Sequence, residues 1–140
     1  MTKEVSIKIK GKQCYPQGEC AETVTEVTGE YHLRNGSHYV MYEEREAGFA
    51  EGTKCMLKIR GDIIELTRKG LLQSRMVFEK DKLHMTDYST PYGSMMLGVY
   101  TKNIQVAEAE NEFFIQITYE LTAQDSHMAD SEIAIKIIGK

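Results

Sequence analysis

Apolar and polar residues alternate along most of this chain. Near the start, Val5, Ile7 and Ile9 alternate with polar residues, and residues 113–121 repeat the alternation near the end. Because successive side chains of a β-strand point to opposite faces, this pattern predicts strands with one apolar face and one solvated face. Gly, Asn and Asp interrupt the pattern about every ten residues, a spacing typical of all-β proteins.

The pattern predicts ten strands in a single domain that covers residues 1–140. The predicted strands are residues 4–11, 22–34, 37–45, 53–60, 63–69, 73–79, 82–89, 94–106, 112–122 and 131–138. Only short turns within residues 14–21 or 46–51 are candidates for helix. Successive hairpins make an antiparallel meander, and a long meander must close or cover its edges. We therefore expect a β-barrel of about eight to ten strands.

A two-residue turn at Asn35-Gly36 sets the register of the strands on either side. Both central residues of a type I′ turn need positive φ, which Asn and Gly tolerate. Counting outward from the turn places Tyr31 opposite Val40 on the apolar face, and the same count carried further places Glu44 there. The other pairs expected on this face are Leu33 with His38, Gly29 with Tyr42 and Val27 with Glu44; those on the opposite face are Glu30 with Met41, Thr28 with Glu43 and Glu26 with Arg45.

A second turn at Gly61-Asp62 predicts that Arg68 points into the barrel. The count pairs Cys55 with Arg68 on the inner face, and Lys58 with Glu65 on the outer face. Arg68 and Glu44 then give the interior one cation and one anion, and three interpretations stay open. The two residues form an ion pair that plugs one end of the barrel, or Arg68 receives the carboxylate or phosphate of a small ligand, or the register slips and one or both side chains lie in water.

Charge and hydropathy exclude two classes of partner. The chain carries 17 Lys and Arg against 21 Asp and Glu, a net charge of −4, and it lacks the basic excess that phosphate neutralisation requires. No stretch approaches the ~20 apolar residues needed to span a bilayer, and the first residues lead into an alternating segment instead of a signal-peptide run. We expect a cytoplasmic protein with no nucleic-acid or membrane partner.

The three cysteines support the same setting. Cys14, Cys20 and Cys55 form no CxxC pair, and any disulfide would leave one of them over. Free thiols that pack in the fold, in a reducing compartment, are therefore expected.

The four histidines do not predict a metal site. His32 and His38 fall on opposite faces of the first hairpin, His84 lies on the face opposite Leu83 and Met85, and His127 lies in the polar turn 124–130. No CxxC or HExxH spacing accompanies any of them, so no zinc ligand and no cofactor is assigned.

Familiar catalytic motifs are also missing from the sequence. Ser74, Ser89, Ser94 and Cys55 stand in no GxSxG-type motif, and no phosphate-binding glycine loop is present. Glu43 and Glu44 are adjacent in a strand and point to opposite faces, so they cannot serve one substrate as acid and base. An enzyme is accordingly the third choice, and no catalytic residue is assigned.

Several segments from Tyr42 to Thr101 resemble one protein family. They are Tyr42-Glu43-Glu44, Gly52-Thr53, Leu57-Lys58-Ile59, Arg68, Gly70, Met76-Val77-Phe78, Tyr88, Thr90-Pro91-Tyr92-Gly93 and Gly98-Val99-Tyr100-Thr101. In order and spacing they are similar to the YwiB-like family of small bacterial proteins with a calycin-like, lipocalin-type barrel. The resemblance implies that fold and a bacterial cytosolic setting, and it carries no activity or site.

Two functions from different classes follow. The first is non-enzymatic binding of a small, partly apolar molecule in the barrel, with an anionic group as one option. Its predicted site residues are Arg68, Glu44, Tyr42, Tyr88, Pro91, Tyr92 and Tyr100. The second is a structural or interaction module, filled by its own side chains, that docks a protein partner or forms a homodimer. A cavity of several hundred cubic ångströms would favour the first function.

Overall fold

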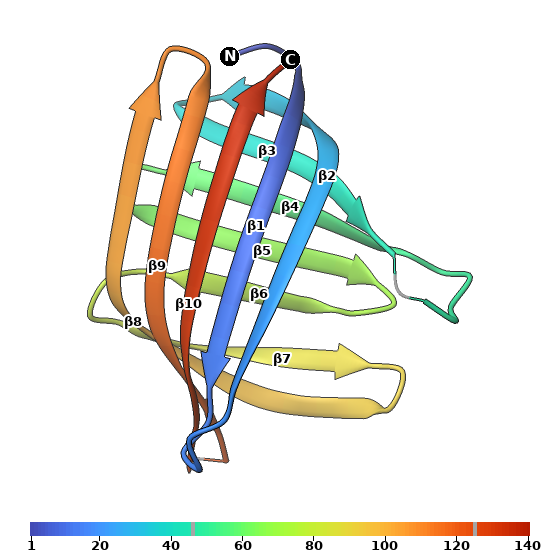
Figure 1. Cartoon of the computed structure of the whole chain (residues 1–140), viewed down its shortest axis with the longest axis vertical. Helices are drawn as coiled ribbons and strands as arrows, with labels where there is room; N and C mark the ends of the chain where they lie inside the picture. The colour runs from blue at the N-terminus through green and yellow to red at the C-terminus, as the bar shows by residue number, and fades with distance from the viewer. Residues whose placement is uncertain (46, 125) are drawn as a thin grey trace.

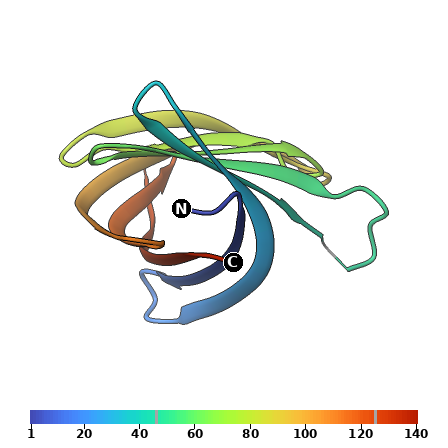
Figure 2. The ribbon, with the colours of Figure 1, turned by 90° about the horizontal axis from the view of Figure 1, so that it is seen from above.

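Ten antiparallel strands form one sheet that curls into a nearly closed barrel in a computed structural model of the chain (Figure 1, Figure 2). The structure describes residues 1–45, 47–124 and 126–140. The strands are β1 (Glu4–Cys14), β2 (Cys20–Arg34), β3 (Ser37–Glu44), β4 (Thr53–Arg60), β5 (Ile63–Gly70), β6 (Ser74–Phe78), β7 (Leu83–Thr90), β8 (Gly93–Ala109), β9 (Glu112–Ala123) and β10 (Ser126–Gly139). The all-β prediction is confirmed.

The described residues contain no helix, and none that could cross a membrane. The predicted helical turn within residues 14–21 is a tight turn between β1 and β2. In the other candidate, Glu46 lies outside the described residues, and the rest of that segment is turn and irregular chain.

The barrel closes where the two edge strands of the sheet, β6 and β7, meet. The strand order of the sheet is β6-β5-β4-β3-β2-β1-β10-β9-β8-β7, so the first and last strands pair in the middle and β6 and β7 form the two edges. These edges meet at Gln73 and Ser89, which exchange backbone hydrogen bonds of 3.0 and 2.9 Å. Thr86 adds a side-chain acceptor for the backbone N–H of Arg75 at 3.1 Å. These hydrogen bonds satisfy some of the backbone N–H and C=O groups at the two sheet edges, although β6 and β7 do not pair along their length.

The Asn35-Gly36 turn has the predicted conformation, with φ of 52° and 78°. The pairs nearest the turn are confirmed: Leu33 with His38, Tyr31 with Val40, and Glu30 with Met41. Beyond Glu30 the predicted pairs are wrong, because β2 continues along β1 while β3 continues along β4. The pairs that do not form are Gly29 with Tyr42, Val27 with Glu44, Thr28 with Glu43 and Glu26 with Arg45.

Replacing Asn35-Gly36 with two valines is expected to lower the free energy of unfolding by more than about 1 kcal/mol. Both residues would be forced to positive φ, where a β-branched side chain collides with its own backbone. Urea denaturation measures the change, and Ala in place of the exposed Lys80 is a suitable surface control. An unchanged midpoint and slope would contradict the turn assignment.

The Gly61-Asp62 turn also sets the predicted register, by a different conformation. Only Gly61 has positive φ, at 58°, as in a type II′ turn with Gly in the first central position. Cys55 faces Arg68 and Lys58 faces Glu65, where the ammonium and carboxylate lie 3.8 Å apart. This hairpin holds its register along its whole length.

Two further sequence expectations are wrong. Cys14, at the end of β1, lies opposite Cys20, at the start of β2, and the two form a disulfide, so Cys55 is the one free thiol among the described residues. The five residues between them, 15–19, form a turn that places the two cysteines directly opposite each other. The predicted strands ended before this turn, so the sequence did not indicate the pairing. His127 is the second error: it belongs to β10, which begins at Ser126, and not to a turn.

Candidate functional site

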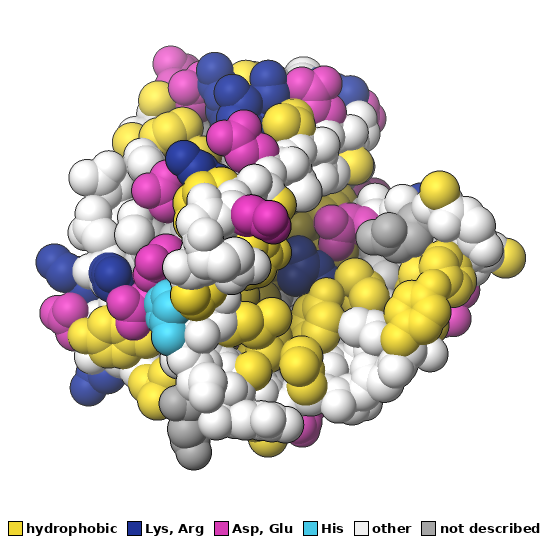
Figure 3. Space-filling model, turned by 60° about the horizontal axis from the view of Figure 1, so that its bottom comes forward, with side chains coloured by type: hydrophobic (Ala, Val, Ile, Leu, Met, Phe, Trp, Pro, Cys, Tyr) yellow, Lys and Arg dark blue, Asp and Glu magenta, His cyan; other side chains and the backbone are white. Residues whose placement is uncertain are grey.

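The barrel encloses a cavity of about 480 Å³. Its walls are the inward-facing residues of the alternating strands, chiefly aliphatic and aromatic side chains: Leu57, Leu66, Met76, Phe78, Ile117 and Leu121. Figure 3 shows the hollow, with apolar walls and a basic side chain deep inside it. At the end of the barrel where β9 begins, the interior is filled by Phe113, whose ring packs against that of His38 at 4.7 Å between centroids. The cavity is therefore open at one end.

One row of paired residues crosses the cavity wall from β3 to β6. Strand pairing joins Tyr42 to Cys55, Cys55 to Arg68, and Arg68 to Ser74. Directly opposed residues in an antiparallel sheet share a face. Glu44 follows Tyr42 by two residues and so faces the same interior. The predicted inward direction of both Arg68 and Glu44 is thus confirmed by the strand register.

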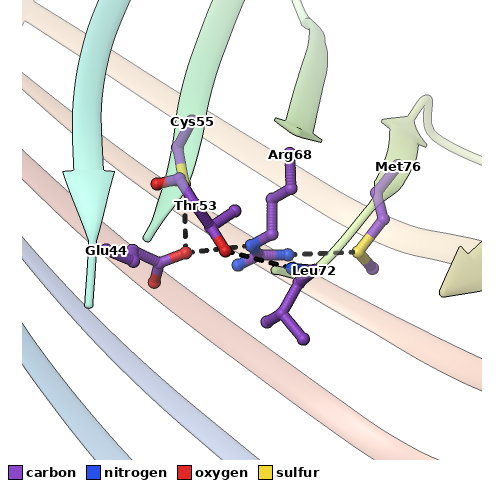
Figure 4. A network of polar contacts seen from close by, with 6 residues as sticks. All are labelled: Glu44, Thr53, Cys55, Arg68, Leu72 and Met76. Atoms are coloured by element: carbon purple, nitrogen blue, oxygen red, sulfur yellow. Dashed lines mark hydrogen bonds and ion pairs between the residues drawn. The ribbon is translucent and has the colours of Figure 1, made fainter. Parts of the chain in front are cut away.

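Arg68 and Glu44 form an ion pair inside the barrel (Figure 4). The guanidinium Nε donates to Glu44 Oε1 at 3.1 Å, and the two side chains are 21% and 24% exposed. Burial lowers the pKa of Arg68 and the carboxylate of Glu44 raises it, with a net rise. Nη1 lies 4.0 Å from Met76 Sδ, a weak acceptor. Because a guanidinium has five N–H donors in a planar fork, its remaining donors are left for another acceptor.

Cys55 provides a second donor to the same carboxylate. Its thiol lies 3.0 Å from Glu44 Oε1, and burial together with the Glu44 contact raises the pKa of Cys55 to about 12. At neutral pH the group is therefore a thiol that can donate, and not a nucleophilic thiolate. Burial also raises the pKa of the adjacent Tyr42. Arg68 and Cys55 together hold Glu44 from two strands.

The structure brings four of the seven predicted site residues to the cavity wall: Tyr42, Glu44, Arg68 and Tyr88. Tyr92 stands outside the cavity at the β7–β8 turn, 89% exposed, and its ring contacts Phe49. Pro91 precedes it in that turn and does not line the cavity. Tyr100 lies on the outer face, because it alternates with the buried Val99 and Thr101. Pro91, Tyr92 and Tyr100 therefore do not line the cavity, and their expected position at it is wrong.

Tyr119 of β9 lines the cavity, and the sequence analysis placed it on an apolar strand face without assigning it to the site. It is 4% exposed, and its ring contacts that of Phe78 at 5.0 Å between centroids. Burial raises the pKa of Tyr119, while the charge of Arg68 acts in the opposite direction. Its inward direction follows from the alternation of residues 113–121, and the burial of Tyr119 confirms it. Its proximity to Arg68 depends on barrel closure and has no local signal.

These features define a small all-β barrel protein with an internal cavity and a charged pair in its wall. Residues 7–135 match the family described as "Domain of unknown function (DUF1934)", and the chain belongs to that family. The crystal structure of ywiB protein from Bacillus subtilis is similar, with a TM-score of 0.86 and 19% identity over 99% of this chain and 92% of that one. The expected resemblance to a YwiB-like barrel is confirmed. No curated protein matches the sequence.

Proposed function

We propose that this protein binds a small, largely apolar molecule in the barrel and holds an acceptor group of that molecule at Arg68. The observation that carries the proposal is the cavity of about 480 Å³ with Arg68 in its wall. The guanidinium donates from Nε to Glu44 and has further N–H groups for a ligand. Sites for small ligands are concave, mostly apolar, and carry a few polar groups that fix orientation. A side-chain-filled structural module would not leave such a space.

The charges around the cavity limit the kind of ligand. Lys12 and Arg68 are balanced by Glu44 and Glu132 among the lining residues, so the site offers no strong field to a multiply charged molecule. Glu44 occupies the Nε edge of Arg68 and leaves Nη groups toward the cavity. A single carboxylate or a neutral carbonyl suits this remaining edge, since a guanidinium pairs readily with planar oxygen acceptors.

The outer face of β7 and β8 supports the second candidate, a docking module. Leu83 and Met85 are 56% and 55% exposed there, and Met96 is 47% exposed. Exposed apolar residues that cluster on one face favour contact with a protein partner or a second copy. A homodimer remains a prediction, and it is compatible with ligand binding because the two features lie on opposite faces of the sheet.

A bacterial cytoplasmic setting and kinship to calycins remain predictions. The Cys14–Cys20 disulfide does not support a reducing compartment, because two of the three expected free thiols are bonded.

Native mass spectrometry of protein purified from its own host tests the proposed function. We expect a non-covalent small-molecule adduct on the wild-type chain, lost in Arg68→Met, because the cavity keeps its apolar wall but loses its donor. Arg75→Met is the matched control, since Arg75 is paired with Glu65 and its side chain is 67% exposed. A wild-type chain without an adduct, or an adduct that survives Arg68→Met at the wild-type level, would count against the proposal.

A further inference from the structure

Strand pairing gathers potential metal ligands on the outer face of the barrel, at the end where β9 meets β10. Asp130 of β10 lies directly opposite Glu120 of β9, and also opposite Cys14 of β1. Ala129 and Ser131, on either side of Asp130, are buried, so this row faces outward. These residues lie far apart in sequence, and the sheet alone brings them together.

A β-bulge adds a histidine to this row. In a regular strand His127 and Asp130 would point to opposite faces, because they are three residues apart. The register of β10 shifts between His127 and Ala129, with Met128 as the extra residue. His127 therefore turns to the same face as Asp130, and its Nε2 lies 3.5 Å from Asp130 Oδ1. Met128 turns inward and lines the cavity.

The three side chains can converge on one cation. One nitrogen of His127 and one carboxylate oxygen each from Glu120 and Asp130 lie within 4.8 Å of one another. Ligand atoms of a tetrahedral zinc ion at about 2.0–2.1 Å are about 3.3 Å apart, so small rotations of these exposed side chains suffice. Like charges directly opposite in a sheet are unfavourable, and a divalent cation between Glu120 and Asp130 would reverse that cost.

The ammonium group of Lys102 reduces part of the repulsion between Glu120 and Asp130. Lys102 Nζ lies 2.9 Å from Glu120 Oε1, and this hydrogen bond raises the pKa of Lys102. The ammonium neutralises one of the two carboxylates and leaves the second with His127. A metal ion would have to displace Lys102 from Glu120, and removal of this lysine should therefore strengthen metal binding.

We propose that Glu120, His127 and Asp130 form a surface site for a divalent transition metal such as Zn²⁺. One imidazole and two carboxylates suit a borderline metal, and three protein ligands leave a position for water. The three residues do not line the cavity, and the position of His127 in β10, instead of the expected turn, brings it beside the two carboxylates.

Isothermal titration calorimetry with Zn²⁺ tests the site. The titration uses oxidised protein without a thiol reductant, so that Cys14 and Cys20 remain bonded and contribute no thiolate. We expect saturable binding of one ion, weakened by more than about tenfold in His127→Ala and in Asp130→Asn, since even outer-shell partners are worth about 10–100-fold. Lys102→Met should bind Zn²⁺ more tightly than the wild type.

His84→Ala is the matched control, because His84 lies 3.1 Å from the carboxylate of Glu79 and forms a pair of one histidine and one carboxylate. The affinity of the His84→Ala variant for Zn²⁺ should equal that of the wild type. NMR of the histidine rings gives a second readout, in which Zn²⁺ should shift the His127 resonances first. Absence of saturable binding, or an equal loss in His84→Ala and His127→Ala, would overturn the proposal.

Discussion

Replacing Phe78 with alanine is expected to lower the free energy of unfolding by about 3–5 kcal/mol. The ring is 1% exposed, contacts Tyr119, and forms part of the cavity wall. Its loss removes buried apolar surface and enlarges a space that the strands cannot close without losing their pairing. Urea or guanidinium denaturation followed by circular dichroism measures the change.

Phe113→Ala is the matched variant. Phe113 is 2% exposed and fills the opposite end of the barrel beside Tyr31 and His38, outside the cavity lining. We expect a similar loss of stability from both substitutions, but a change in ligand capture only from Phe78→Ala. If Phe78→Ala cost less than about 1 kcal/mol, the position of this ring in the core would be wrong.

Glu44→Gln is expected to destabilise the protein by about 2–3 kcal/mol. Breaking a fully buried ion pair costs about 3–5 kcal/mol, and the value is smaller here because both side chains retain some contact with solvent. The amide can still accept one hydrogen bond, but it leaves the charge of Arg68 without a counter-ion. Arg68→Met should cost less, since a methionine packs well among the apolar residues around it.

The double variant separates the two interpretations of the ion pair. If Glu44 is the chief partner of Arg68, combining the two substitutions should recover part of the loss, and the coupling energy should exceed about 0.5 kcal/mol. Glu43→Gln is the control, because Glu43 faces outward and pairs with Arg45. Additive effects of Glu44→Gln and Arg68→Met would show that the pair contributes nothing to stability, and would leave ligand capture as the reason for an inward arginine.

The barrel explains why the charged pair and the cavity occur together. Four consecutive strands from β3 to β6 carry the row of Tyr42, Cys55, Arg68 and Ser74, and Tyr119 reaches the same space from β9. A sheet that stayed flat would expose this row to water, where Arg68 and Glu44 would interact only weakly. Closure removes most of the contact of the two side chains with water, which strengthens their interaction, and it leaves the other donors of Arg68 facing the cavity.

The sequence by itself determined the strands, the two hairpin registers near their turns, and the inward direction of Arg68. These features depend on period-two alternation and on turn residues whose φ preferences act over a few positions. The pairs predicted beyond Glu30 in the first hairpin do not form, because β2 continues along β1 while β3 continues along β4, and the residues of a turn do not determine where two strands separate.

Only the tertiary structure decided which distant residues meet. Glu44 and Arg68 are 24 residues apart and come together through two hairpins, while Tyr119 reaches the cavity because the sheet closes. The cluster of Glu120, His127 and Asp130 depends on strand pairing and on one bulged residue, which reverses the face of His127. Such contacts result from the packing of the whole sheet, and no local pattern of residues specifies them.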